Sequence, residues 1–232
     1  RRYAVKVIHR PLADRADLVE RFAREARAMS RVQSDHIVDV VDVIEAPDGR
    51  QCIVTEKLDG KDLEEHVSGG RKLPPSEAVR WVRQACRGAS AAHALGVVHR
   101  DLKPSNLFLA SDAGGSVALK ILDFGVAKIG GESADVTSTG VIVGTPAFMA
   151  PEQARGASSA DARSDVYALG AVLYRLVTGQ TPYGGSDAST TLIRLLEESP
   201  ARPSVVDKTV PAGLEAVIEK AMARDPAERY QT

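Results

Sequence analysis

The apolar positions in the first quarter of the chain predict a strand, a helix and a hairpin. Residues 1–8 have the character of a strand interior. Apolar residues then recur at helical spacing from Leu18 to Met29, which predicts an amphipathic helix. Two β-branched runs follow, at residues 37–44 and 51–55, and the Pro-Asp-Gly turn between them favours a hairpin. These elements predict a small first lobe that ends with the second run.

The rest of the chain is mostly helical in pattern. Small apolar residues repeat at helical spacing from Pro75 towards Gly96, and glycine suits the position just past a helix end. Residues 130–144 carry small and hydroxyl side chains without periodicity, which is typical of a regulatory or otherwise functional loop. The other predicted elements are short strands at residues 107–109 and 117–122 and helices at residues 166–177, 192–197 and 214–222.

The composition is that of an ordinary soluble domain. Of the 232 residues, 44% are hydrophobic and 26% are charged, and the formal net charge is -1. Neither sign is in excess, so we expect no nucleic acid partner and no contact with an anionic membrane. Cys52 and Cys86 lack metal-binding spacing, and no apolar run is long enough to span a bilayer. We expect a reducing, cytoplasmic location for this domain, which a parent protein anchored in a membrane would also allow.

Three short motifs carry the clearest chemical signal. Residues 99–106 read HRDLKPSN, residues 123–125 read DFG and residues 150–152 read APE. Each string alone arises often by chance, but the ordered set with these gaps is far more specific. The set resembles the catalytic loop, the metal-binding triplet and the loop-closing triplet of protein kinases. The run PEQARG at residues 151–156 points, within that family, to the bacterial eukaryotic-like serine/threonine kinases.

This resemblance covers essentially every residue and implies an α+β, two-lobed protein-kinase-like fold. Residues 1–56 would form a small lobe, an antiparallel sheet with one helix but without the first strands of the family. A hinge is implied at residues 57–62 and a large, mostly helical lobe at residues 63–232. Residues 123–152 would form the activation segment.

The implied activity is transfer of the γ-phosphate of ATP to serine and threonine hydroxyls of proteins. Phosphoryl transfer needs mainly positioning and charge neutralisation. By the resemblance, Asp101 orients the substrate hydroxyl and accepts its proton, while Lys103 offsets charge on the transferring phosphate. Asn106 and Asp123 supply hard oxygen ligands suited to Mg²⁺, or Mn²⁺, which arrives with ATP. Without the surrounding motif, Asp101 and Asn106 would each be better explained as capping residues.

A lysine and a glutamate of the small lobe are predicted to pair. Lys6 ends the run YAVK and resembles the family lysine that holds the ATP phosphates. Glu25 lies three residues after Phe22 and four before Met29, so it shares the apolar face of its helix. An ionised carboxylate there needs a cationic partner, and Lys6 is the predicted one. The alternative is an edge-strand lysine, with Glu25 partly exposed beside a neighbouring arginine.

The adenine pocket is implied at the lobe boundary. Apolar side chains would pack the two faces of the base, two backbone groups would bond its edge, and one side chain would lie at the back. In that order, the residues are Ala4 and Phe108, Glu56 and Leu58, and Thr55. Asp62 is implied to reach the ribose, although a carboxylate at a helix N-terminus is an equally good interpretation.

Arg100 suggests control by phosphorylation. Kinases with an arginine directly before the catalytic aspartate commonly use it to bind a phosphorylated loop residue. The loop here offers Thr137 and Thr139. Our hypothesis is that autophosphorylation at these threonines orders the loop and raises activity; solvated hydroxyls are the alternative. A double alanine variant with unchanged activity would contradict the hypothesis.

Three more residues have implied supporting roles. Thr145 would bond the charged residues of the catalytic loop, and with the Lys-Pro pair of that loop it favours serine/threonine over tyrosine specificity. Glu152 would pair with Arg229. Asp165 would hold the backbone of the catalytic loop, but a plain helix cap explains it about as well.

The Gly-rich loop of the family is missing, since only five residues precede Lys6. We therefore expect a fragment of a longer domain that is poorly stable and weak or inactive alone, with an open sheet edge. The alternative is a catalytically inactive interaction module, if the parent protein also lacks the loop. A small-molecule phosphotransferase is disfavoured by the activation loop and the APE triplet. A homodimer is compatible with the resemblance.

Overall fold

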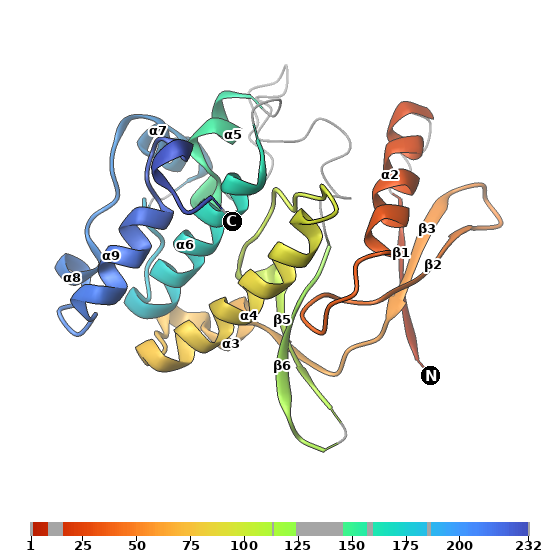
Figure 1. Cartoon of the computed structure of the whole chain (residues 1–232), viewed down its shortest axis with the longest axis horizontal. Helices are drawn as coiled ribbons and strands as arrows, with labels where there is room; N and C mark the ends of the chain where they lie inside the picture. The colour runs from red at the N-terminus through yellow and green to blue at the C-terminus, as the bar shows by residue number, and fades with distance from the viewer. Residues whose placement is uncertain are drawn as a thin grey trace.

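The chain folds into two lobes of different size. The computed structural model describes residues 2–8, 16–112, 114–123, 146–156, 160–184 and 187–231; the side chains of residues 16–18, Arg21 and Glu25 are outside this description. Figure 1 shows the small lobe, a sheet with one helix, on the right and the larger, mostly helical lobe on the left. The predicted two-lobed α+β architecture is confirmed.

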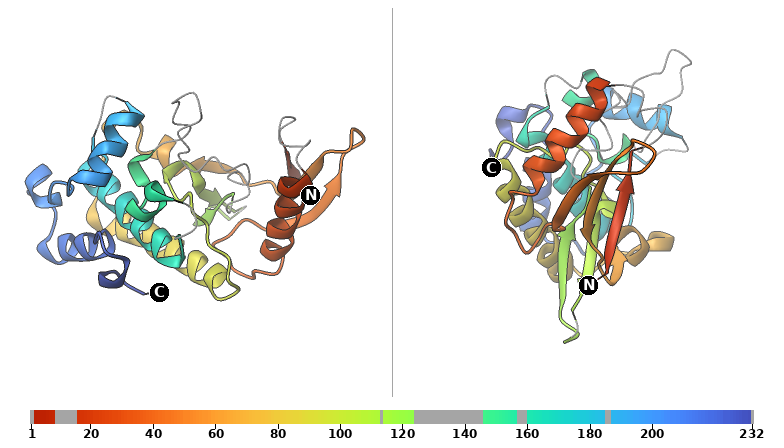
Figure 2. Two further views of the ribbon diagram at one scale, coloured as in Figure 1. Left: turned by 90° about the horizontal axis from the view of Figure 1, so that it is seen from above. Right: turned by 90° about the vertical axis from the view of Figure 1, so that its right-hand side faces the viewer.

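The small lobe is a three-stranded antiparallel sheet with one helix packed on it. The strands lie in the order β1 (Tyr3–Val7), β3 (Gln51–Glu56) and β2 (Val40–Glu45). Helix α2 (Ala16–Met29) lies against one face (Figure 2), where Phe22 packs with Ile53 of β3. Strand β1 lies at an edge of this sheet, and its Tyr3 and Val5 side chains are exposed.

The connection between the lobes is shorter than predicted. Residues 57–59 link β3 to β4 (Gly60–Asp62), and β4 pairs with β5 (Leu107–Ser111) of the large lobe. The last three residues of the predicted hinge are therefore a strand of the second sheet. Gly60 permits this pairing, because a Cβ at that position would lie 2.0 Å from the carbonyl oxygen of Leu109.

The large lobe is built around α6 (Ala162–Thr178), which is buried along most of its length. Helices α4 (Pro75–His93) and α9 (Ala212–Ala221) pack on it. Gly170 allows the close approach of α9, since a Cβ there would lie 2.8 Å from that of Ala221. The other elements are β6 (Val117–Ile121), α3 (Leu63–His66), α5 (Pro151–Arg155), α7 (Ala188–Glu197) and α8 (Pro203–Val206), with 3-10 turns at Ser68–Gly70, Pro104–Asn106, Pro146–Phe148 and Pro226–Glu228.

The segment between α2 and β2 packs on the large lobe. Ile37 forms a parallel bridge with Ile121 of β6, and the N–H of Ile121 donates to the carbonyl oxygen of His36 at 2.9 Å. Gly88 of α4 permits this contact, because a Cβ there would lie 2.6 Å from the same oxygen. The strand predicted at residues 37–44 therefore begins only at Val40, and its first residues join the two lobes instead.

The predicted hairpin is present as β2–β3, and the short strands predicted at residues 107–109 and 117–122 pair with each other as β5–β6. The chain turns after α4 at Gly96, whose φ of +73° is the left-handed conformation expected there. The loop predicted at residues 130–144 lies outside the described residues. Among the helices that the structure describes, none is both long enough and apolar enough to cross a membrane.

Candidate active site

The catalytic loop, residues 99–106, follows α4 and is held by a carboxylate from α6. The N–H groups of His99 and Arg100 donate to the two oxygens of Asp165, each at 2.8 Å. Asp165 is fully buried, and Asp161 is the residue that caps α6. The structure thus confirms the backbone contact predicted for Asp165 and excludes the helix-cap alternative.

The ring of His99 connects the catalytic loop to the end of β6. Its Nε2 lies 2.8 Å from the carbonyl oxygen of Leu122, which can only accept, so Nε2 carries the proton. Its Nδ1 then accepts the N–H of Asp101 at 3.2 Å. Burial lowers the pKa of His99, which agrees with a neutral ring. No separate role for this histidine was predicted from the sequence.

Two predicted catalytic residues, Asp101 and Lys103, and the predicted metal ligand Asn106 lie together in this loop. Lys103 Nζ is 3.1 Å from Asp101 Oδ2. Asn106 Nδ2 donates to the backbone oxygen of Asp101 at 2.7 Å and lies 3.3 Å from its Oδ2. Because the amide nitrogen of Asn106 is used in this way, the amide oxygen is the atom left to act as a metal ligand.

A lysine of the small lobe and an aspartate of the large lobe meet across the lobe boundary. Lys6 Nζ lies 3.0 Å from Asp123 Oδ1, and the two side chains are 36% and 48% exposed. An ion pair this exposed contributes little to stability. The geometry thus brings the predicted phosphate-binding lysine to the predicted metal ligand. The pairing of Lys6 with Glu25 remains a prediction, because the side chain of Glu25 lies outside the description.

Two residues of the site have left-handed backbone conformations. Arg100 has a φ of +66° and Asp123 a φ of +51°, and they are the only non-glycine residues of the described chain with positive φ. Such conformations are unfavourable for residues with a side chain and persist where surrounding contacts fix them. They lie next to Asp101, the predicted catalytic aspartate, and at the start of the predicted metal-binding triplet.

A pocket of about 430 Å³ lies between the lobes, in the size range of small-ligand sites. Residues of both lobes line it, and the predicted adenine-site residues are among them. Lys6 and Asp123 lie at the same pocket. The predicted lining residues are Ala4, Thr55, Glu56, Leu58 and Phe108, and those that the sequence analysis missed include Met29, Val38, Val40, Ile53 and Leu122.

Some predicted site residues are not brought to this pocket. Asp62 is absent from the described residues that line it, and its Oδ1 accepts the N–H of Glu65 at 2.8 Å as the cap of α3. The contacts therefore support the capping interpretation of Asp62. Thr137, Thr139 and Thr145 lie outside the described residues.

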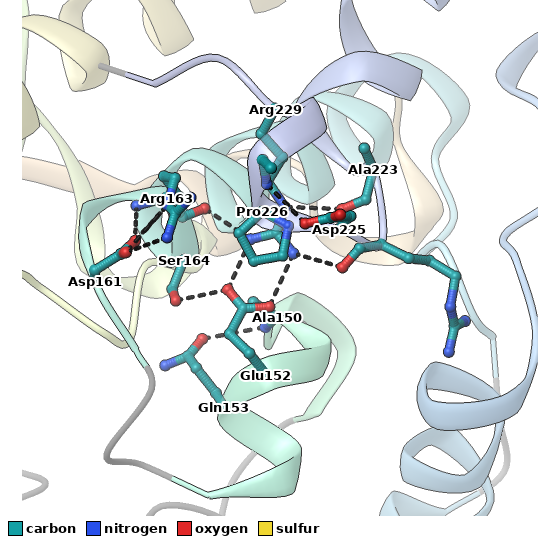
Figure 3. A network of polar contacts seen from close by, with 12 residues as sticks. Ala150, Glu152, Gln153, Asp161, Arg163, Ser164, Ala223, Asp225, Pro226 and Arg229 are labelled. Atoms are coloured by element: carbon teal, nitrogen blue, oxygen red, sulfur yellow. Dashed lines mark hydrogen bonds and ion pairs between the residues drawn. The ribbon is translucent and has the colours of Figure 1, made fainter.

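The loop-closing triplet is tied to the end of the chain by a buried ion pair. Glu152 pairs with Arg229, as predicted, and also bonds to the hydroxyl of Ser164 (Figure 3). The two contacts with Arg229 are 2.7 and 2.8 Å long, and the one with Ser164 is 2.7 Å long. Burial by itself would raise the pKa of Glu152, but the bonds from Arg229 and Ser164 outweigh it and leave the pKa lowered. The guanidinium group also lies 4.9 Å from the centre of the Tyr167 ring.

The chain is similar to known proteins in sequence. The family model described as "Protein kinase domain" matches residues 1–232. Serine/threonine-protein kinase Pkn1 of Myxococcus xanthus is 42% identical over 229 residues, which are 99% of this chain and 32% of Pkn1. Serine/threonine-protein kinase PknB of Mycobacterium leprae is 38% identical over 232 residues, 99% of this chain and 36% of PknB. The chain spans about a third of the length of these curated relatives.

Solved structures share the same architecture. The crystal structure of the Mycobacterium tuberculosis PknI kinase domain matches with a TM-score of 0.76 and 28% sequence identity. The match covers 99% of this chain and 81% of the PknI chain, so the likeness includes both lobes.

Proposed function

Because the chain belongs to the protein kinase family, as its motifs indicated, we propose that the protein transfers the γ-phosphate of ATP to serine and threonine hydroxyls of proteins. The observation that carries this proposal is the cluster of Asp101, Lys103 and Asn106. The backbone oxygen of Asn106 accepts the N–H of Leu122 at 2.9 Å, which joins this cluster to the residue before Asp123 and so to the Lys6–Asp123 pair. Phosphoryl transfer depends on positioning and charge neutralisation, which this set of groups supplies.

The proposed work of the catalytic loop is to orient and deprotonate the substrate hydroxyl. The carboxylate of Asp101 accepts the hydroxyl proton, and the bond from Asn106 helps to set the direction of that carboxylate. Lys103, paired with the same carboxylate, balances negative charge on the phosphate during transfer.

The residues present fit a nucleotide with a bound magnesium or manganese ion. The Asp123 carboxylate and the Asn106 amide oxygen are hard ligands, which Mg²⁺ prefers, and the pocket has the volume of a small-ligand site. The ion, when bound, supplies positive charge next to the phosphates. Lys6 would bind the phosphates, Ala4 and Phe108 would pack on adenine, and the backbone of the connection between the lobes would bond its edge.

Residues of the activation segment and of the small lobe are proposed to regulate the activity. Arg100 would bind phosphorylated Thr137 or Thr139, and Thr145 would contact the substrate side of the catalytic loop. Glu25 would pair with Lys6 in the active form. Protein substrates, a cytoplasmic location and a homodimer remain proposals for the whole protein.

The test is magnesium-dependent transfer of labelled γ-phosphate by the full-length protein to a generic protein substrate and to itself. Replacing Asp101 by Asn removes the proton acceptor, and we expect activity to fall by about a hundredfold or more. Asp112→Asn is the matched control, because Asp112 Oδ1 accepts the N–H groups of Gly114 and Ser116 in the β5–β6 turn, and these bonds should be dispensable for transfer. Undiminished transfer by the Asp101 variant would refute the proposed role of Asp101.

A further inference from the structure

Gln153 bridges two segments that lie about fifty residues apart in the chain. It directly follows the loop-closing triplet in α5 and is 8% exposed. Its Nε2 donates to the backbone oxygen of Arg100 at 2.8 Å, and its Oε1 accepts the N–H of Ala150 at 3.1 Å. Both ends of the amide are therefore used in one defined orientation, which is how a buried amide side chain avoids the cost of desolvation.

The contact with Arg100 bears on the catalytic aspartate. The carbonyl group of Arg100 and the N–H of Asp101 belong to the same peptide group. Gln153 holds the oxygen of this peptide, and His99 Nδ1 accepts its N–H at 3.2 Å. One residue earlier, the N–H of Arg100 is held by Asp165. The left-handed φ of Arg100 lies between these fixed points, and the contacts around it maintain an otherwise unfavourable conformation.

We propose that Gln153 is a positioning residue for Asp101, which fixes the Arg100–Asp101 peptide and thereby the direction of the catalytic carboxylate. This inference rests on the proposed kinase function. A displacement of about 1 Å in a reacting group can lower a rate by about a hundredfold, so a bond to this peptide affects catalysis although Gln153 touches neither substrate nor nucleotide. It also gives the loop-closing triplet a direct connection to the catalytic loop.

The two contacts of Gln153 can be separated by substitution. In Gln153→Glu, one oxygen still accepts from Ala150, but an ionised carboxylate repels the Arg100 oxygen instead of donating to it. In Gln153→Met, a side chain of similar length loses both contacts. A role confined to starting α5 predicts little effect of the glutamate, whereas the positioning role predicts a loss of activity in both variants.

For the full-length protein with Gln153→Glu, we expect kcat to fall by about tenfold to a hundredfold at pH 8. The KM for ATP should change by less than about twofold, because Gln153 is not among the residues that line the pocket. Lowering the pH protonates the new carboxyl, whose pKa burial raises above about 4.3, and its O–H then donates to Arg100. The ratio of variant to wild-type kcat should therefore rise towards pH 6 for Gln153→Glu and stay constant for Gln153→Met.

Gln84→Met is the matched control. Gln84 also bonds a backbone group, the N–H of Leu119 at 2.8 Å, but it lies on α4 away from the catalytic loop. The Gln84→Met substitution should lower the melting temperature but leave kcat unchanged. The positioning role is overturned if both Gln153 variants keep wild-type kcat, if the loss matches the unfolded fraction, or if the glutamate variant shows no recovery at low pH.

Amide hydrogen exchange gives a readout that does not depend on activity. Exchange of the Asp101 amide should be faster in Gln153→Met than in wild type and unchanged in Gln84→Met, because only the first loosens that peptide. If the wild-type protein transfers no phosphate, the proposed function fails, while faster exchange still supports the contact. Unchanged exchange in Gln153→Met overturns the inference in either case.

Discussion

Asp101 depends on neighbours that carry no reacting group. Its carboxylate is oriented by Asn106, and its peptide N–H is accepted by the neutral ring of His99. That ring can accept at Nδ1 only while it stays unprotonated, because imidazolium has donors at both nitrogens. Burial disfavours the charged form of His99, so the fold itself keeps the ring in the state that the catalytic loop requires.

The burial of the neutral His99 ring predicts that the protein loses stability in mild acid. The folded-state pKa of His99 is lowered, whereas an unfolded histidine titrates at about 6.5. Below that pH the unfolded chain takes up a proton that the folded chain resists, so the free energy of unfolding decreases as the pH falls. For one proton, the free energy of unfolding changes by at most about 1.4 kcal/mol per pH unit.

Urea denaturation of wild type and His99→Asn at pH 7.5 and pH 5.5 measures this contribution. Asparagine cannot titrate here, and the other histidines contribute equally to both proteins. The wild type should therefore lose more stability on acidification than the variant does. Identical pH dependence in the two proteins would show that His99 does not resist protonation in the folded state.

Residues of the proposed chemistry were easier to predict than the residues that hold them. Lys6 and Asp123 were predicted from the runs YAVK and DFG, which resemble protein-kinase motifs, and the structure brings them to the same pocket. His99 and Gln153 lie inside the runs HRDLKPSN and PEQARG. The contacts that matter here are with distant backbone groups, Leu122 for His99 and Arg100 for Gln153. A bond from a side chain to a distant backbone group has no periodicity or charge pattern, so the sequence does not reveal it.

At the level of elements, one buried ion pair fastens three parts of the large lobe. Glu152 comes from α5, and Arg229 follows the last 3-10 turn. Ser164 and the backbone oxygen of Arg163, both from α6, bond to the same pair. The helix α5 is short and has no independent reason to be stable, so it depends on these contacts.

We expect Arg229→Met to destabilise the large lobe by about 3–5 kcal/mol, because it leaves the Glu152 carboxylate buried without its partner. Chemical denaturation of the full-length protein measures the loss. Arg202→Met is the control: its pair with Glu219 is 70% and 44% exposed and should contribute less than about 1 kcal/mol. If the two substitutions lower the free energy of unfolding equally, burial of the Glu152–Arg229 pair does not add to stability.

Long elements could be predicted from the sequence, and short ones could not. The long helix from Pro75 and the β2–β3 hairpin followed from periodicity and turn chemistry. The short α3, α5 and α8 were missed because a single turn contains no repeat. The start of α6 was placed at residue 166, four residues late, because its first turn is capped by Asp161 and carries polar residues that face the catalytic loop and the ion pair.

At the level of the whole molecule, the two lobes touch beyond their covalent connection. The segment at Ile37 bonds to β6, and a second contact lies at the end of β3. There Lys120 of β6 donates to Glu56 Oε1 at 2.6 Å, and the same oxygen accepts the N–H of Asp39 at 3.0 Å. Glu56 also lines the pocket, so this contact between the lobes involves a residue of the proposed nucleotide site.

The Glu56–Lys120 pair should therefore influence nucleotide binding more than chemistry. Loss of the Lys120 ammonium group in Lys120→Met frees the end of β3, and a bond to a charged group is worth about 1.5–3 kcal/mol, reduced here by partial exposure. We expect the KM for ATP to rise by about threefold to tenfold, with a smaller change in kcat, in steady-state assays of the full-length protein.

A charge exchange tests whether the pair itself is responsible. Glu56→Lys alone should raise the KM for ATP, because two cations then face each other, and combining it with Lys120→Glu should restore much of the affinity. Arg50→Met breaks an ion pair with Asp48 inside one turn of the small lobe and should leave the KM unchanged. If the increases in KM for ATP from the two single substitutions simply add in the double variant, the pair does not hold the lobes together. A KM for ATP in the double variant that returns towards the wild-type value would show that a contact between the lobes controls nucleotide affinity. The two residues of this contact lie 64 positions apart in the sequence.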